Sequence, residues 1–119
     1  MQKKIWIGLE GIEFYAYHGV YEEERIIGGK YILDISVYTV AEKALHNDDL
    51  NGTVNYELLY NIAKKNMQQP VKLIEHLAQK ILNDIRKIVN NDDVIKIKLK
   101  KIHPPLGAEV QASFIELED

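Results

Sequence analysis

The sequence contains no cysteine, and this absence excludes three kinds of chemistry. Disulfide bonds, zinc sites built on thiolates and thiol nucleophiles all require that side chain. The chain also lacks a surplus of positive charge, because 15 lysines and arginines stand against 18 aspartates and glutamates. No basic face dominates, so binding to nucleic acid is not expected.

Long hydrophobic runs are missing as well. The apolar stretch within MQKKIWIGLEG is too short for a signal peptide or a membrane span, and Glu10 interrupts it. No membrane contact is therefore expected, and the cytoplasm is the expected compartment. With 119 residues and no linker or repeat, the chain is expected to form a single domain, residues 1–119.

Patterns typical of metal and cofactor sites are also absent. The sequence contains no glycine-rich phosphate loop and no GxSxG motif, so no cofactor is expected. The four histidines show neither His-x-His spacing nor an i, i+4 pair: His18, His46, His76 and His103. No metal site is expected. His18 is interpreted as a structural histidine that forms a hydrogen bond near Gly19.

Alternating apolar residues predict four strands. In the first strand, Ile5, Ile7 and Leu9 are followed after Gly11 by Ile12, Phe14 and Ala16. This change of parity at a glycine is typical of a β-bulge. The second strand follows a turn at Gly28 and Gly29 and should pair with the first as a hairpin with a long connection. The apolar positions of the later strands are Tyr31, Leu33, Ile35 and Val37, then Ile95, Ile97 and Leu99, then Val110, Ala112, Phe114, Ile115 and Leu117.

Two helices are predicted between the second and third strands. Asn55 is a candidate N-cap, apolar residues recur at helical spacing up to Met67, and QQP at 68–70 ends this helix. A wide apolar stripe predicts the second helix over about 72–89. The segments 46–52 and 90–93 are expected to be loops.

The predicted order is strand, strand, helix, helix, strand, strand. This ββααββ order indicates an α+β fold, an antiparallel four-stranded sheet with both helices on one face. The other face would still carry Trp6, Tyr38 and Val40. Apolar side chains in that position suggest that another subunit covers the sheet.

Lys101 departs from the pattern of the third strand. There the odd positions are apolar and the even positions are lysines, so Lys101 should point toward the helices. Desolvation favours the neutral amine of a lysine, which would suit a catalytic base. The alternative is that the strand ends at Lys100 and that Lys101 is simply exposed.

Three further positions are candidates for binding or catalysis. Tyr56 at the start of the first helix offers a hydroxyl group, although such a tyrosine is often structural. Glu75 lies in the first turn of the second helix, where it either complements the helix dipole or grips a ligand beside free backbone amides. The acidic run 22–24 is expected in a loop, where such runs are usually solvated.

Taken together, these segments resemble the dihydroneopterin aldolase family, and the resemblance covers nearly the whole chain. The matching segments, in order, are FYAYHGV (14–20), Glu24, Gly28, Asp34, DDL (48–50), TVNY (53–56), LIEHLA (73–78) and Lys101 before the PP turn. The chain has Gly29 where the family often has glutamine, and Ile102 where many members have proline. The resemblance implies the tunnelling fold, in agreement with the element order predicted above.

The family resemblance implies a reaction of folate biosynthesis. 7,8-Dihydroneopterin is cleaved by a retro-aldol step to 6-hydroxymethyl-7,8-dihydropterin and glycolaldehyde, without a metal or a lysine Schiff base. The protonated dihydropterin ring accepts the electrons released from the broken bond. Epimerisation at a side-chain carbon is a possible side activity.

The resemblance also assigns roles by position. Lys101 would take part in removing the hydroxyl proton, and Tyr56 would help to protonate the enol-like intermediate. Glu75 would pair through both oxygens with the pterin edge. The Ile74 backbone and Val54 would line the pocket, and Glu24 would meet the polyol tail, although Glu22 and Glu23 are alternatives.

The resemblance further implies that the chain assembles as a homo-octamer of two stacked rings, the usual assembly of the family, in which the sheets form a multi-subunit barrel and the sites lie between subunits. Two other interpretations stay open. One is a dihydroneopterin triphosphate epimerase, which the acidic run at the tail end disfavours. The other is a non-catalytic pterin-binding module, which would be expected to lack Lys101 or Tyr56.

Overall fold

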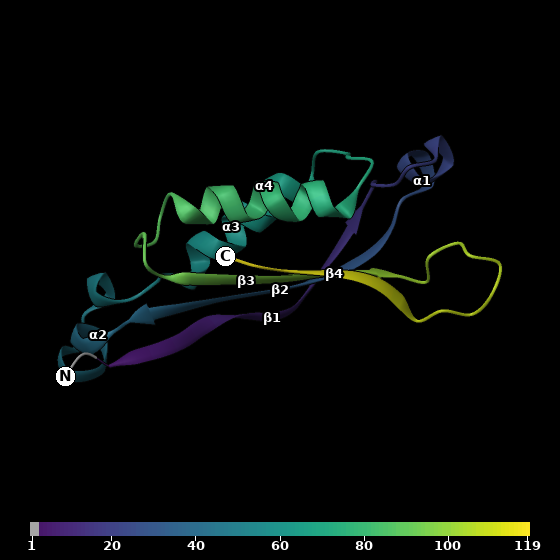
Figure 1. The fold of residues 1–119 in the computed structure, drawn as a ribbon. Coiled ribbons are helices and arrows are strands. Elements are labelled where there is room, and N and C mark those ends of the chain that lie inside the picture. Colours follow the sequence, from purple (N-terminus) through teal and green to yellow (C-terminus); the bar gives the residue numbers. More distant parts are fainter. Residues whose placement is uncertain (1–2) are drawn as a thin grey trace.

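A computed structural model of the chain describes residues 3–119, and its centre is an antiparallel sheet with the strand order β1-β2-β3-β4 (Figure 1). Helices α3 (Tyr56–Met67) and α4 (Ile74–Arg86) pack together on one face of this sheet. The strands are β1 (Lys4–Ala16), β2 (Gly29–Val40), β3 (Val94–Ile102) and β4 (Ala112–Glu118). This arrangement confirms the predicted α+β fold and the ββααββ order of its main elements.

Three short elements differ from the prediction. The acidic run expected in a loop begins α1 (Glu22–Ile27), and the segment 46–52 contains the end of α2 (Glu42–Asn47) and a 3₁₀ turn, η1 (Leu50–Gly52). Six residues make fewer than two helical turns, so they show no repeating apolar stripe. Acidic side chains in the first turn of α1 also favour a helix, because they complement its dipole.

The predicted β-bulge is confirmed between β1 and β2. Leu9 lies opposite Ile35 and Ile12 opposite Leu33, so two residues of β1 face one residue of β2. Gly11 adopts a positive φ of 68°, and its N–H donates to Oδ1 of Asp34 at 2.6 Å. The extra residue returns the apolar side chains of β1 to the helix side of the sheet.

The hydrophobic core fills the space between the sheet and the two long helices. Its fully buried members include Leu33, Ile35, Val37, Ile95, Ile97 and Leu99 from the sheet, and Leu59, Leu77, Ile81 and Ile85 from the helices. The Asn55 cap is confirmed, because its Oδ1 accepts the Glu57 N–H at 3.0 Å. Helix α4 is shorter than predicted, and β4 begins two residues later than predicted.

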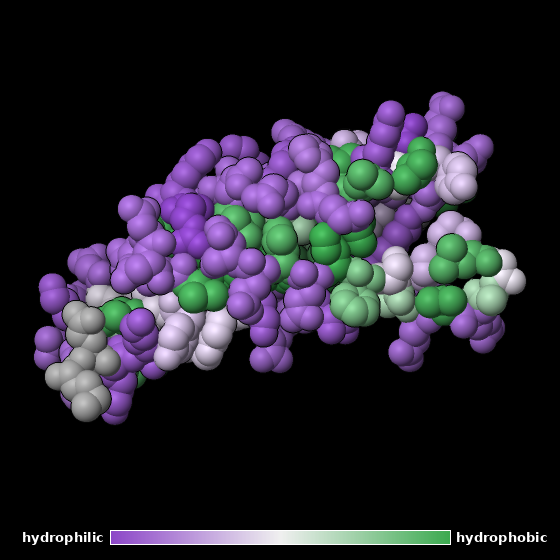
Figure 2. All heavy atoms as spheres, in the orientation of Figure 1, coloured by the Kyte–Doolittle hydropathy of each residue, from purple (hydrophilic) through white to green (hydrophobic). Residues whose placement is uncertain are grey.

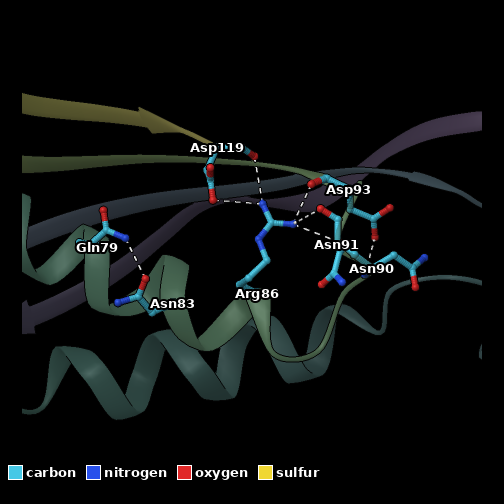
Figure 3. Close-up of polar contacts among 7 residues, drawn as sticks. All are labelled: Gln79, Asn83, Arg86, Asn90, Asn91, Asp93 and Asp119. Atoms are coloured by element: carbon cyan, nitrogen blue, oxygen red, sulfur yellow. Dashed lines mark hydrogen bonds and ion pairs between the residues drawn. The ribbon is translucent and has the colours of Figure 1, made fainter.

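One arginine holds the end of α4 against the end of the sheet (Figure 3). The guanidinium of Arg86 donates to the carbonyl oxygens of Asn90 and Asp93, at 3.2 and 2.8 Å. It also donates to the carbonyl oxygen of Asp119 at 3.1 Å and pairs with the Asp119 carboxylate. Five donors in a planar fork allow a single side chain to serve all these acceptors.

Exposed apolar groups include those on the outer face of the sheet and those at one end of the molecule. On the outer face of the sheet, Trp6 is 51% exposed and its ring centre lies 5.0 Å from that of Tyr38. The end of the molecule with α1 and the β3–β4 connection also shows apolar side chains, at the right of Figure 2, and Ile26, Ile27 and Leu106 are exposed there. That another subunit covers the outer face stays a prediction.

Within residues 3–119, no helix is both long and apolar enough to cross a membrane.

Candidate active site

Lys101 lies on the helix side of the sheet, as the alternation in β3 predicts. It is paired with Tyr31 of β2, which is buried, and its own side chain is only 17% exposed. The ammonium forms an ion pair with the carboxylate of Glu24, whose side chain is 15% exposed. The ion pair gives the Lys101 amine a charged partner in a place where both side chains are mostly shielded from solvent.

Glu24 is placed by the tight approach of α1 to the chain at Gly19. A Cβ atom at Gly19 would lie 2.5 Å from the Cβ of Glu24, so only glycine leaves room for this carboxylate. Oε1 of Glu24 also accepts the N–H of Tyr21 at 3.3 Å. Burial raises the pKa of Glu24, but the hydrogen bonds from Lys101 and Tyr21 and the nearby charges of Lys101 and Arg25 outweigh burial and lower the pKa overall.

A cavity of about 470 Å³ opens beside this ion pair. Glu24, Ile74, Glu75 and Lys101 all line it, so four of the six predicted site residues come together. They come from α1, the first turn of α4 and the end of β3. Val20, Leu73, Leu106 and Phe114 supply apolar walls. The size suits a small bicyclic molecule, and the mixture of apolar walls with a few charged groups is typical of ligand sites.

A second cavity of about 410 Å³ lies on the other side of the Lys101–Glu24 pair, and His18 and Tyr31 line it. Burial and the charge of Glu24 raise the pKa of Tyr31 to about 12, although its hydrogen bond to the His18 carbonyl lowers it. The Tyr31 phenol therefore stays protonated near neutral pH and donates its hydrogen bond to the His18 carbonyl oxygen. The sequence pattern placed Tyr31 on the apolar face of its strand without a functional role, because its register opposite Lys101 is visible only in the structure.

Val54 and Tyr56 lie away from Lys101. Tyr56 is 53% exposed at the start of α3 and borders a shallow hollow with Leu9, Ile12 and Tyr60. Val54 is buried and lines a cavity of about 830 Å³, and neither Lys101 nor Glu75 is among the residues that line it.

The helix hairpin explains this separation of Tyr56 from Glu75. Helices α3 and α4 are joined by six residues, so they pack antiparallel and their N-termini lie at opposite ends of the pair. Twelve helical residues span about 18 Å. Within one chain, the phenol of Tyr56 and the carboxylate of Glu75 are therefore too far apart to contact one small ligand.

The structure shows no metal-binding group in the part of the chain that it describes. Within residues 3–119, no three side chains of histidine, cysteine, aspartate or glutamate are grouped to hold a metal ion. His18 is buried, as expected for a structural histidine, and its Nδ1 accepts the N–H of Val71 at 3.1 Å.

Comparison with known proteins places the chain in a family. The family model for dihydroneopterin aldolase matches residues 7–118. The dihydroneopterin aldolase of Bacillus subtilis (strain 168) is 34% identical over 110 residues, which cover 92% of each chain.

Solved structures share the fold at lower sequence identity. The dihydroneopterin aldolase of Escherichia coli matches with a TM-score of 0.84 and 19% identity over 98% of both chains. That of Burkholderia thailendensis matches with a TM-score of 0.71 and 15% identity over 99% of this chain and 90% of its own. The structural matches support the fold, and the family model and the Bacillus relative decide the family. The chain belongs to the dihydroneopterin aldolase family, and its function is that of a carbon–carbon lyase acting on dihydroneopterin.

Proposed function

We propose that the cavity beside Lys101 is the catalytic part of the aldolase site. Retro-aldol cleavage of 7,8-dihydroneopterin requires a base for the side-chain hydroxyl, a group that holds the pterin, and a proton donor for the enol-like intermediate. The observation that carries the proposal is that Lys101, Glu24, Ile74 and Glu75 line one cavity. These four residues come from three separate elements, and each was predicted from the sequence to contact the substrate.

Lys101 is proposed to take part in removing the hydroxyl proton, directly or through a water molecule. As the proton of the second side-chain hydroxyl leaves, the bond between the first and second side-chain carbons breaks, glycolaldehyde departs, and the electron pair enters the protonated pterin ring. Glu24 contacts the Lys101 ammonium, so a substrate hydroxyl near the polyol end would meet both groups. The Glu24 carboxylate would then help to hold the tail beside Lys101.

Glu75 is proposed to hold the pterin edge. Its two oxygens suit the adjacent ring N–H and exocyclic amine, and the Ile74 backbone lies beside it in the first turn of α4. The structure of the Escherichia coli relative is a complex with neopterin, and that of the Burkholderia relative is bound to guanine. Both ligands carry the same aminopyrimidinone edge, which supports a carboxylate partner in this fold.

Tyr56 and Val54 are proposed to reach the site from a neighbouring copy of the chain. One chain cannot bring Tyr56 to Glu75, because these residues begin antiparallel helices. An assembly such as a homo-octamer would join the two parts, and in a barrel it would also leave no open sheet edge. The proposed compartment is the cytoplasm.

The reaction chemistry is tested by incubating the protein with 7,8-dihydroneopterin and assaying glycolaldehyde. We expect release of glycolaldehyde in buffer alone, with a metal chelator and with borohydride. Strong inhibition by the chelator would indicate a metal, and strong inhibition by borohydride would indicate a Schiff base. Either result would contradict the proposed mechanism.

The shared site is tested by mixing two inactive variants, Lys101→Ala and Tyr56→Phe, and reassembling them from denaturant. If each site combines Lys101 of one copy with Tyr56 of another, random assembly in equal amounts restores roughly a quarter of the sites. If both groups come from the same copy, no site is restored. The matched control refolds each variant alone, and neither is expected to recover activity.

A further inference from the structure

His18 and Gly19 together bind both backbone groups of one residue in the connection between the long helices. Nδ1 of His18 accepts the N–H of Val71 at 3.1 Å, and the N–H of Gly19 donates to the carbonyl oxygen of Val71 at 2.9 Å. His18 is only 1% exposed, so its bond is shielded from water. A shielded bond costs more to lose than one at the surface, because no water replaces the missing partner.

The segment that Val71 belongs to has few other attachments. Of the six residues 68–73, only Val71 is not exposed, and it packs against the core. The side chain of Gln69 accepts a hydrogen bond from Lys80, an exposed contact of small energetic value. The segment leads directly into Ile74 and Glu75 at the start of α4, and the N-cap residue Leu73 provides no side-chain cap. Ile74 in the first turn of α4 packs against the core, and the chain just before that turn is held mainly through Val71.

The other side of His18 is attached to the strand pair that carries Lys101. The hydroxyl group of Tyr31 donates to the His18 carbonyl oxygen at 2.8 Å, and the two rings meet edge to face with centres 5.2 Å apart. Tyr31 in turn lies opposite Lys101 in the sheet. His18 thus lies between the base and the turn that carries Glu75.

We propose that His18 is a positioning residue, whose Nδ1 sets the distance between the Glu75 turn and Lys101 by accepting the Val71 N–H. This inference rests on the proposed role of Glu75 in holding the pterin. Only the tautomer with its proton on Nε2 can accept at Nδ1, so the link requires one form of the neutral ring. Without the acceptor, the segment 68–73 can move, and Glu75 then meets the pterin in a displaced geometry.

The test uses substitutions that place an acceptor differently. His18→Asn keeps an acceptor near the position of Nδ1, His18→Gln places it near the position of Nε2, and His18→Leu removes it. Ile85→Val, a small core change far along α4, is the control for a general loss of stability. Steady-state kinetics with 7,8-dihydroneopterin give kcat and KM for each variant, and Glu75→Gln is measured beside them.

We expect His18→Leu and His18→Gln to raise KM roughly tenfold, with kcat within about threefold of the unsubstituted protein, because ligand binding is disturbed more than proton transfer. His18→Asn and Ile85→Val should keep both constants within about threefold. If His18→Leu does not fold, the comparison of His18→Asn with His18→Gln decides the question.

Two results overturn the inference. One is a KM equally changed in His18→Asn and His18→Gln, which would show that the position of the acceptor is irrelevant. The other is an unchanged KM in His18→Leu while Glu75→Gln raises it, which would leave the pterin site in place without His18 as its support. If Glu75→Gln itself leaves KM unchanged, the proposed role of Glu75 fails first, and that outcome is distinct from the other two.

Discussion

The buried imidazole of His18 predicts a loss of stability in mild acid. Burial is the largest cause, and together with the charges of Lys101 and Lys80 it lowers the pKa of His18 from its ordinary value of 6.5 to about 4, although the Met67 backbone favours the protonated form. In the unfolded chain the imidazole of His18 therefore binds a proton near pH 6.5. In the folded chain the same imidazole does not bind a proton until the pH nears 4. The stability that neutral His18 contributes is fully present above the pKa of this histidine in the unfolded chain, and it is lost as the pH falls below that pKa.

The size of the effect follows from the two pKa values. Between pH 7 and pH 5 the unfolded histidine becomes almost fully protonated, while the folded one stays mostly neutral. This difference lowers the free energy of unfolding by about 2 kcal/mol. The pKa of Glu24 is lowered in the folded protein, so the stability it contributes is lost only at lower pH, below its ordinary value. The interval from pH 7 to pH 5 therefore reports mainly on His18.

Urea unfolding at both pH values measures this loss, with one fixed protein concentration because assembly also affects stability. Far-ultraviolet circular dichroism and the fluorescence of Trp6, the only tryptophan, follow the transition. His18→Asn cannot titrate in this range, so it should lose much less stability than the unsubstituted protein. His46→Gln changes an exposed histidine and should behave like the unsubstituted protein. Equal losses with and without His18 would refute the reasoning.

Three further predictions test other parts of the structure. Lys101→Ala should lower kcat at least about 100-fold and retain pterin binding, which fluorescence follows. A variant that loses pterin binding but keeps a normal rate at saturating substrate would contradict the role of Lys101 as a base. Arg86→Met should reduce the free energy of unfolding by about 1–3 kcal/mol, because three carbonyl groups lose their donor, and an unchanged urea midpoint would show that solvent replaces it. Gly8→Ala should lower the free energy of unfolding by about 1–3 kcal/mol, because the added Cβ would overlap the carbonyl oxygen of Ile35. Gly29→Ala is the control, because the space around its Cβ is open, and it should change the free energy of unfolding by less than about 0.5 kcal/mol.

Local periodicity was sufficient to predict the main elements and the face on which Lys101 lies. Side chains alternate along a strand, so a lysine at an odd position of β3 must share the side of Ile97 and Leu99. The helical stripe likewise gave α4, and the parity change at Gly11 gave the bulge. Short helices escaped this reasoning, because six residues do not repeat a pattern.

Only the tertiary structure decided which candidates meet. Glu24 and Lys101 are 77 residues apart, and their pairing depends on the way α1 folds back over the end of β3. Antiparallel packing of α3 and α4 separates Tyr56 from Glu75, although both begin helices in sequence. Periodicity shows which face of its own helix or strand a residue occupies. Contacts between elements depend instead on how the connecting loops place those elements against one another. The sequence alone therefore determined the elements and their buried faces, and the packing of those elements decided the site.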